Sequence, residues 1–156
     1  NFGLARVDGS VSAGMFLAAS VFDDTPGEMI SAPRDPDYPF AAQLAFRVEG
    51  DSMDKAEPRP IRDGDFVICC AWSDLGLEPA DGMILVIQQT LDDGRLRERS
   101  VKKFSLDGDR AIFAPMSSNP KHAPIIVPRD FNPEDGKQVT ILGLVRFVFD
   151  YQVIRW

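Results

Sequence analysis

The chain from residue 42 onward is a succession of short apolar segments separated by turns rich in glycine, proline and aspartate. In residues 44–48, LAFRV, apolar side chains recur at every second position, which is the period of a β-strand with one buried face. No stretch shows sustained helical periodicity, and a short helix after Gly50 is the best candidate for one. The sequence therefore predicts a mainly β domain whose sheets fold over one core.

The other expected strands are short apolar runs bounded by turn residues. They cover residues 66–70, 83–87, 96–104, 110–114, 125–127 and 139–149. Asp92-Asp93-Gly94 separates residues 83–90 from residues 96–104, so we expect these two strands to form a hairpin.

The first 39 residues differ from the rest and are expected to form an arm and a linker. Residues 1–22 contain small residues and glycines, which favour an extended or mobile arm over a helix. Residues 23–39 contain four prolines and five acidic residues, which predicts a solvated loop. We therefore divide the chain into an arm at 1–39 and a β-rich domain at 40–156. Because the chain begins with Asn1 rather than Met, we expect it to be a fragment or a processed product.

Charge and cysteine content narrow the classes of function. A net charge of −7 argues against a domain that itself grips DNA or an anionic membrane. The two cysteines, Cys69 and Cys70, are adjacent and offer no disulfide framework or zinc spacing, so we read them as core thiols of a cytoplasmic protein. The longest apolar runs are far shorter than the ~20 residues of a membrane-spanning helix. A single histidine, His122, excludes a histidine-rich metal site and is expected to be a loop residue.

Two segments carry residues suited to nucleophilic chemistry. Ser52 follows Gly50, at the point where a strand is expected to end in a turn. Lys102 and Lys103 lie on an expected strand, so one of them can enter a buried site while the other stays in water. A serine hydroxyl needs a base, and with one histidine in the chain a lysine is the plausible one. Such a lysine acts only when neutral, which burial beside Val101 would favour.

Several motifs in order resemble a known family. They are GDSM at 50–53, DGD at 63–65, VKKF at 101–104, APMSSNP at 114–120 and an Ala-Gly pair at 13–14. Together they resemble the self-cleaving repressors typified by LexA and the phage lambda repressor. The mutagenesis protein UmuD belongs to the same serine–lysine peptidase group, and bacterial signal peptidases share its chemistry.

The resemblance implies a compact LexA-like or signal-peptidase-like β domain and assigns roles to particular residues. Ser52 would be the nucleophile and Lys102 the general base, because the family's base directly follows the apolar residue that is Val101 here. Backbone N–H groups of Ser52 and Met53 would form the oxyanion hole, with Met53 packed beneath the turn. The scissile bond would join Ala13 and Gly14. No cofactor and no metal are implied.

The resemblance also implies partners. The domain would form a homodimer, would bind operator DNA only through an upstream helix-turn-helix domain absent from this chain, and would be triggered after DNA damage by an activated RecA filament. Two alternatives stay open: a UmuD-like subunit that trims its own arm for a translesion polymerase, and a dimerisation and sensing module that does not cleave. A signal peptidase is disfavoured because nothing in the sequence anchors to a membrane.

Overall fold

The computed structural model describes residues 2–13, 17–18 and 28–150 of the chain. Its strands are β1 (Phe2–Ser12), β2 (Leu17–Ala18), β3 (Met29–Pro33), β4 (Gln43–Glu49), β5 (Phe66–Ala71), β6 (Ile84–Leu91), β7 (Leu96–Asp107), β8 (Arg110–Ala114), β9 (Ile125–Pro128) and β10 (Gln138–Phe149). A single-turn 3₁₀ helix, η2, covers Trp72–Asp74. Among the described residues, no helix has the length and apolar character that a membrane span requires.

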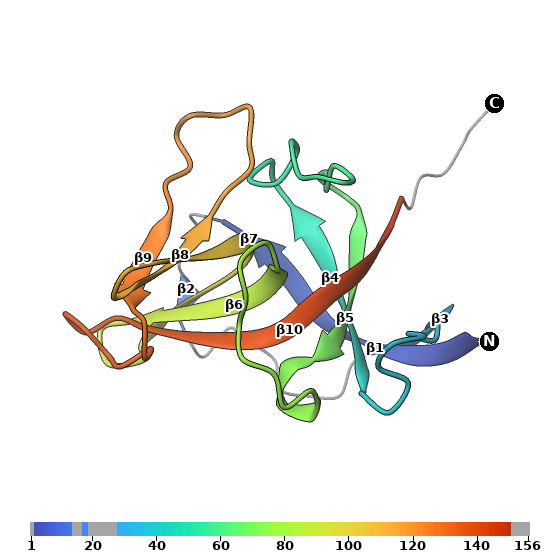
Figure 1. Cartoon of the computed structure of the whole chain (residues 1–156). Helices are drawn as coiled ribbons and strands as arrows, with labels where there is room; N and C mark the ends of the chain where they lie inside the picture. Colours follow the sequence, from blue (N-terminus) through green and yellow to red (C-terminus); the bar gives the residue numbers. More distant parts are fainter. Residues whose placement is uncertain (1, 14–16, 19–27, 151–156) are drawn as a thin grey trace.

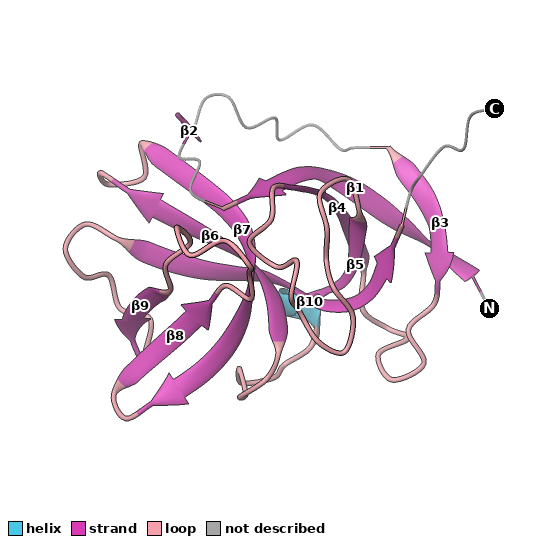
Figure 2. Ribbon diagram, turned by 90° about the horizontal axis from the view of Figure 1, so that it is seen from above, coloured by secondary structure: helices cyan, strands magenta, loops and turns pink. Residues whose placement is uncertain are grey.

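The strands form one mixed sheet in the order β3-β1-β4-β5-β10-β6-β7-β8-β9, with β2 paired to β7 (Figure 1). Among these pairs β1 and β4 run parallel, and the other neighbours are antiparallel. Strands β1 and β7 are far apart in this order, yet they contact each other. The sheet therefore curls back on itself, as the view from above shows (Figure 2).

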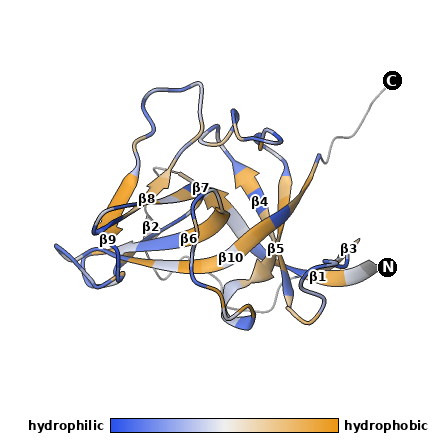
Figure 3. Ribbon diagram, in the orientation of Figure 1, coloured by the Kyte–Doolittle hydropathy of each residue, from blue (hydrophilic) through white to orange (hydrophobic). Residues whose placement is uncertain are grey.

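The core lies where the curled sheet brings the apolar faces of its strands together. The strands carry most of the hydrophobic residues, whereas the connecting loops are mostly hydrophilic (Figure 3). On β4, Leu44, Phe46 and Val48 are all buried while Arg47 is exposed. The alternation in residues 44–48 thus predicted the strand correctly, but its other face is not fully solvated, because Ala45 is 0% exposed and packs in a second apolar cluster with Ile68.

The strands expected from residue 42 onward are all present, and the mainly β fold is confirmed. The hairpin at Asp92-Asp93-Gly94 is confirmed as well, because β6 pairs with β7 from Ile84 and Lys103 down to Leu91 and Leu96. The predicted helix after Gly50 is wrong: residues 51–55 form turns. The backbone N–H of Gly50 donates to the Asp63 carboxylate at 2.8 Å, which ties the start of this loop to its end instead of starting a helix.

The predicted loop over residues 23–39 is wrong for Met29–Pro33, which form β3 and pair with β1. Within this segment Asp35 is also not solvated, because it is 1% exposed and binds the Arg146 guanidinium at 2.5 Å. Burial opposes ionisation of Asp35, but hydrogen bonds from Arg146 and from the backbone of Asp37 and Tyr38 more than offset it and lower its pKa. Pro36 and Pro39 do lie in the loop that follows β3, as expected, whereas Pro33 ends the edge strand and Asp35 forms an ion pair with β10.

The arm is extended over Phe2–Ser12, and this stretch forms β1, a strand inside the sheet between β3 and β4. Its pairing with β4 shifts register between Val7 and Ser10, where Gly9 has a φ of 100°. Only glycine adopts such a dihedral readily, so Gly9 allows the bulge that carries the chain on to Ala13.

Candidate functional site

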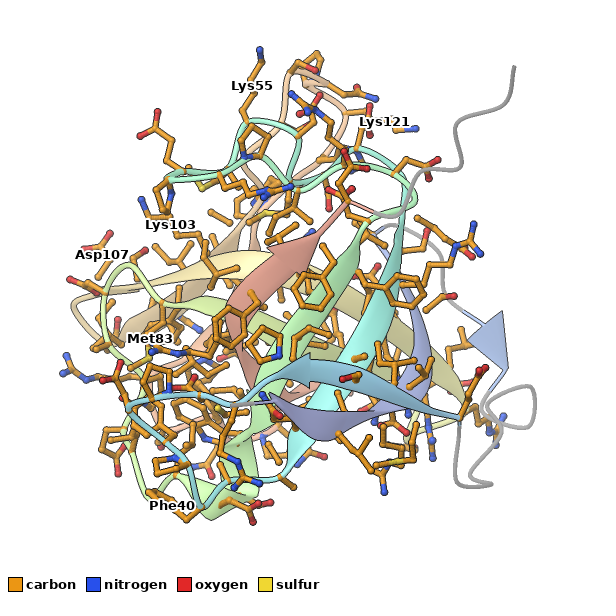
Figure 4. The ribbon with its side chains drawn as sticks, turned by 90° about the vertical axis from the view of Figure 1, so that its right-hand side faces the viewer. Phe40, Lys55, Met83, Lys103, Asp107 and Lys121 are labelled. Carbon is orange, nitrogen blue, oxygen red and sulfur yellow. The ribbon has the colours of Figure 1, made fainter. Side chains whose placement is uncertain are left out.

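Lys102 lies on β7 with its side chain directed into the fold. It pairs with Leu85 of the neighbouring strand β6 and is 2% exposed, while the adjacent Lys103 is exposed. Figure 4 shows Lys103 at the periphery of the molecule. The expectation that one lysine of the pair is buried and the other solvated is confirmed.

The amine of Lys102 is buried away from solvent. Within the described part of the chain, Nζ is fully buried and makes no hydrogen bond. Burial lowers the pKa of Lys102 to about 8, and the nearby Glu98 carboxylate only partly opposes this shift. A pKa so lowered leaves a usable neutral fraction near neutral pH, which is what a lysine base requires.

Ser100 is a second polar group on the same face, and the sequence reasoning did not single it out. It lies two residues before Lys102 on β7, so the strand period places both side chains on one face. Ser100 is 1% exposed, and its Oγ has no hydrogen-bond partner among the described residues. The signal that could have found it is strand alternation, which places Ser100 on the same face as Lys102.

Lys102 and the predicted cleavage arm meet at a cavity of about 220 Å³. Its lining residues are Ala13, Gln89, Glu98, Lys102, Lys121, His122, Ala123 and Ile125. Gly14, on the other side of the predicted bond, lies outside the described residues. Further along the arm, Leu17 of β2 pairs with Arg97 of β7. The described residues on both sides of the predicted bond therefore lie along the strand that carries Lys102.

Ser52 lies in the turn that follows β4. Gly50 has a φ of 91°, which lets the chain leave the strand sharply, and Met53 is buried beneath the turn at 1% exposure, as expected. Ser52 itself is half-buried. Across the described residues, the Ser52 hydroxyl makes no hydrogen bond, and the backbone N–H groups of Ser52 and Met53 donate to no acceptor. The hydroxyl and both N–H groups are thus available to a substrate.

A second loop, residues 115–124 between β8 and β9, is bound to this turn. The N–H of Met116 donates to the Ser52 carbonyl at 2.9 Å, and the N–H of Lys55 donates to the Met116 carbonyl at 2.8 Å. The Ser117 hydroxyl donates to the Asp51 carbonyl at 2.6 Å. Figure 4 shows Lys55 and Lys121, one from each loop, at the same end of the molecule.

His122 joins the turn to the cavity. Its Nε2 lies 2.6 Å from the Asp51 carboxylate, and the ring lines the cavity that holds Lys102 and Ala13. Ser52 is not among the residues that line that cavity, but Asp51, the residue before it, is bound by His122, which does line it. His122 is a loop residue, as expected, but no motif in the sequence predicts its bond to Asp51.

The two cysteines offer no competing nucleophile. Both are free and buried. Burial raises the pKa of Cys69 well above its ordinary value and raises that of Cys70 to about 12, so both stay protonated thiols. In the part of the chain that the structure describes, no group of three or more His, Cys, Asp or Glu side chains could hold a metal ion.

The chain was compared with models of known protein families to find the family to which it is related. A family model described as Peptidase S24-like matches residues 6–146, which include all the candidate site residues. The chain belongs to this peptidase family. The resemblance to LexA and UmuD is thereby confirmed, and the S24-like family supports a self-cleaving, serine-peptidase type of domain. No curated protein matches the chain.

Proposed function

We propose that this S24-like domain is a serine–lysine autopeptidase that cuts its own bond between Ala13 and Gly14, with Ser52 as nucleophile and Lys102 as general base. One observation carries the proposal: the buried amine of Lys102, which bonds to none of the described residues, shares a cavity with Ala13. A lysine held in that way has the protonation behaviour of a base, and the arm supplies a peptide bond next to it.

In the proposed reaction, neutral Lys102 Nζ accepts the Ser52 proton while Oγ attacks the Ala13 carbonyl carbon. The N–H groups of Ser52 and Met53 donate to the developing oxyanion. The ammonium then gives its proton to the departing Gly14 nitrogen, which leaves Ala13 joined to Ser52 as an ester. Water, deprotonated by Lys102, hydrolyses this ester, releases the Ala13 carboxylate and restores Ser52.

The intact masses of the purified chain before and after incubation near pH 7 and near pH 10 test this proposal. We expect two fragments that divide between Ala13 and Gly14, formed faster at the higher pH and absent in Ser52→Ala and Lys102→Ala. Lys103→Ala is the matched control, because it removes the exposed neighbour on the same strand and should cleave like the native chain. Cleavage that survives in Ser52→Ala would overturn the proposal.

We further propose that the domain belongs to a LexA-like transcriptional repressor of the cytoplasm. The family and the net charge of −7 support this role, because an acidic domain suits dimerisation better than DNA contact. An upstream reader would bind the operator, and cleavage would separate it from the dimerising domain and weaken bivalent binding. Activated RecA filament should then speed the cleavage of the purified chain but not of Ser52→Ala. An unchanged rate would argue against a DNA-damage trigger.

A further inference from the structure

The pair formed by His122 and Asp51 is the one described side-chain contact that connects the Ser52 turn with the cavity of Lys102 and Ala13. Asp51 immediately precedes Ser52 in the chain. His122 belongs to the loop between β8 and β9, and its side chain is only 9% exposed. We propose that His122 is a positioning residue, which holds the Ser52 turn at the cavity through Asp51. This inference rests on the proposed self-cleavage.

The charges at this pair define which group donates. The hydrogen bond from His122 lowers the pKa of Asp51 most, with a further contribution from Asn119, so the carboxylate is ionised at neutral pH. An ionised carboxylate only accepts, so His122 Nε2 is the donor. The Asn119 amide donates to the other carboxylate oxygen at 3.3 Å. The bond to a charged acceptor is of the stronger class of hydrogen bond.

The surrounding contacts explain why this pair would matter for position rather than for folding alone. Asp54, on the other side of Ser52, is bound by Ser118 through both its N–H and its hydroxyl. These bonds fix the far end of the turn, but Ser118 is exposed and does not line the cavity. His122 alone among these residues both holds the turn and forms part of the cavity wall. Loss of its bond frees the Asp51 side of the turn while the Asp54 side stays attached.

The test compares two substitutions of His122. Glutamine keeps an N–H donor for Asp51 but cannot take up a proton, whereas alanine removes the donor. We expect His122→Ala to slow self-cleavage roughly tenfold, since a small misplacement of a reacting group has effects of that order. His122→Gln should cleave close to the native rate. Asp51→Ala removes the bond to His122 and also that from Asn119, so it should be at least as slow as His122→Ala, and the double variant should be no slower than Asp51→Ala.

Two further measurements separate positioning from general destabilisation. The thermal midpoint of each variant is compared with that of Arg110→Ala, which removes an exposed ion pair to Glu134 far from the site. The reaction of Ser52 with a small serine-directed reagent is also followed, because it needs the turn but not the arm. His122→Ala should slow this reaction too, and Arg110→Ala should not.

A native rate in His122→Ala would overturn the inference. Equal loss of activity in His122→Gln and His122→Ala would also overturn it, because it would make His122 a base and not a positioning group. Failure of the proposed function is distinguishable from both, since Ser52→Ala and Lys102→Ala would then cleave as the native chain does.

Discussion

At the scale of the residue, burial of the Lys102 amine lowers the stability of the fold. Its amine is buried without a hydrogen bond, and the buried Ser100 hydroxyl two residues away lacks a partner as well within the described structure. A buried polar group without a partner is costly, and natural proteins keep such groups mainly where they act. The lowered pKa of Lys102 measures part of that cost.

Replacement of Lys102 by methionine should therefore stabilise the fold near neutral pH. The amine has a pKa of about 8 in the folded chain and an ordinary value of 10.5, so the unfolded chain binds its proton more tightly. The loss of stability caused by burying the charged amine is complete below its pKa in the folded chain. It disappears as the pH rises through the pKa that the amine has in the unfolded chain. Relative to Lys102→Met, the native free energy of unfolding should rise by about 2 kcal/mol between pH 7 and pH 10.

Denaturant titrations of the native chain and Lys102→Met across that pH range measure this difference. Because both chains share every other titrating group, the effects of those groups cancel in the comparison. Lys103→Met, at the exposed neighbour, is the control, and its free energy of unfolding should differ from the native value by almost the same amount at every pH. If the free energies of unfolding of the native chain and Lys102→Met differ by the same amount at every pH in this range, the amine is solvated.

The sequence predicted Lys102 and not His122 for a physical reason. Strand alternation predicts from neighbouring residues alone that one of Lys102 and Lys103 is buried, and the family resemblance identified Lys102 as that one. His122 acquires its partner from a loop 71 positions earlier in the chain. No local pattern encodes that contact, because it depends on how β8 and β9 return the loop to the end of β4.

At the scale of the element, β1 brings the arm into the sheet. It runs parallel to β4, and the Arg99 guanidinium of β7 donates to the Asp8 carbonyl at 3.2 Å and to the Gln88 side chain at 3.0 Å. Arg99 thus joins the arm to the strand that carries Lys102. Together with the pairing of β1 to β3 and β4, this contact fixes the arm beside β7.

Removal of this contact in Arg99→Ala should slow self-cleavage roughly tenfold, because a hydrogen bond from a charged donor contributes on the order of 1.5 kcal/mol to docking of the arm. The first-order rate is measured by intact mass. Arg95→Ala is the matched control, since its exposed ion pair with Asp92 lies at the hairpin tip. Labelling of Ser52 by a small reagent should stay unchanged in Arg99→Ala. A native cleavage rate in this variant would show that Arg99 does not hold the arm.

The elements that the sequence did not predict share one property. β1 contains glycines and serines, and β3 contains Pro33 beside an acidic stretch, so neither has the composition typical of a strand. They pair with each other, and β1 also pairs with β4. The strands that the sequence did predict have strong alternation or continuous apolar runs. In these strands the local composition favours the same structure as the long-range pairing does.

At the scale of the whole molecule, the curled sheet gathers segments from distant parts of the chain at one end. The arm up to Ala13, the turn of Ser52, β7 with Lys102 and the loop with His122 are all joined there by the bonds and the cavity described above. Because the arm belongs to the same chain as the site, the substrate is present at a high effective concentration.

Self-cleavage should therefore be first order. The fraction cut in a given time should be the same at low and high protein concentration. Mixing an excess of Ser52→Ala chains with native chains should leave the Ser52→Ala chains whole. A rate that rises in proportion to concentration, with cleavage of the Ser52→Ala chains, would show that one molecule cuts another.

We propose that the neutral amine of Lys102 activates Ser52, and the pH dependence of the first-order cleavage rate is the decisive test. The rate should rise about tenfold per pH unit below the pKa and level off above it. The midpoint should lie at about 8, the value to which burial lowers the pKa of Lys102. Lys102→Ala should show no such rise. A cleavage rate that does not change with pH, or a rise with pH that persists in Lys102→Ala, would contradict activation of Ser52 by Lys102.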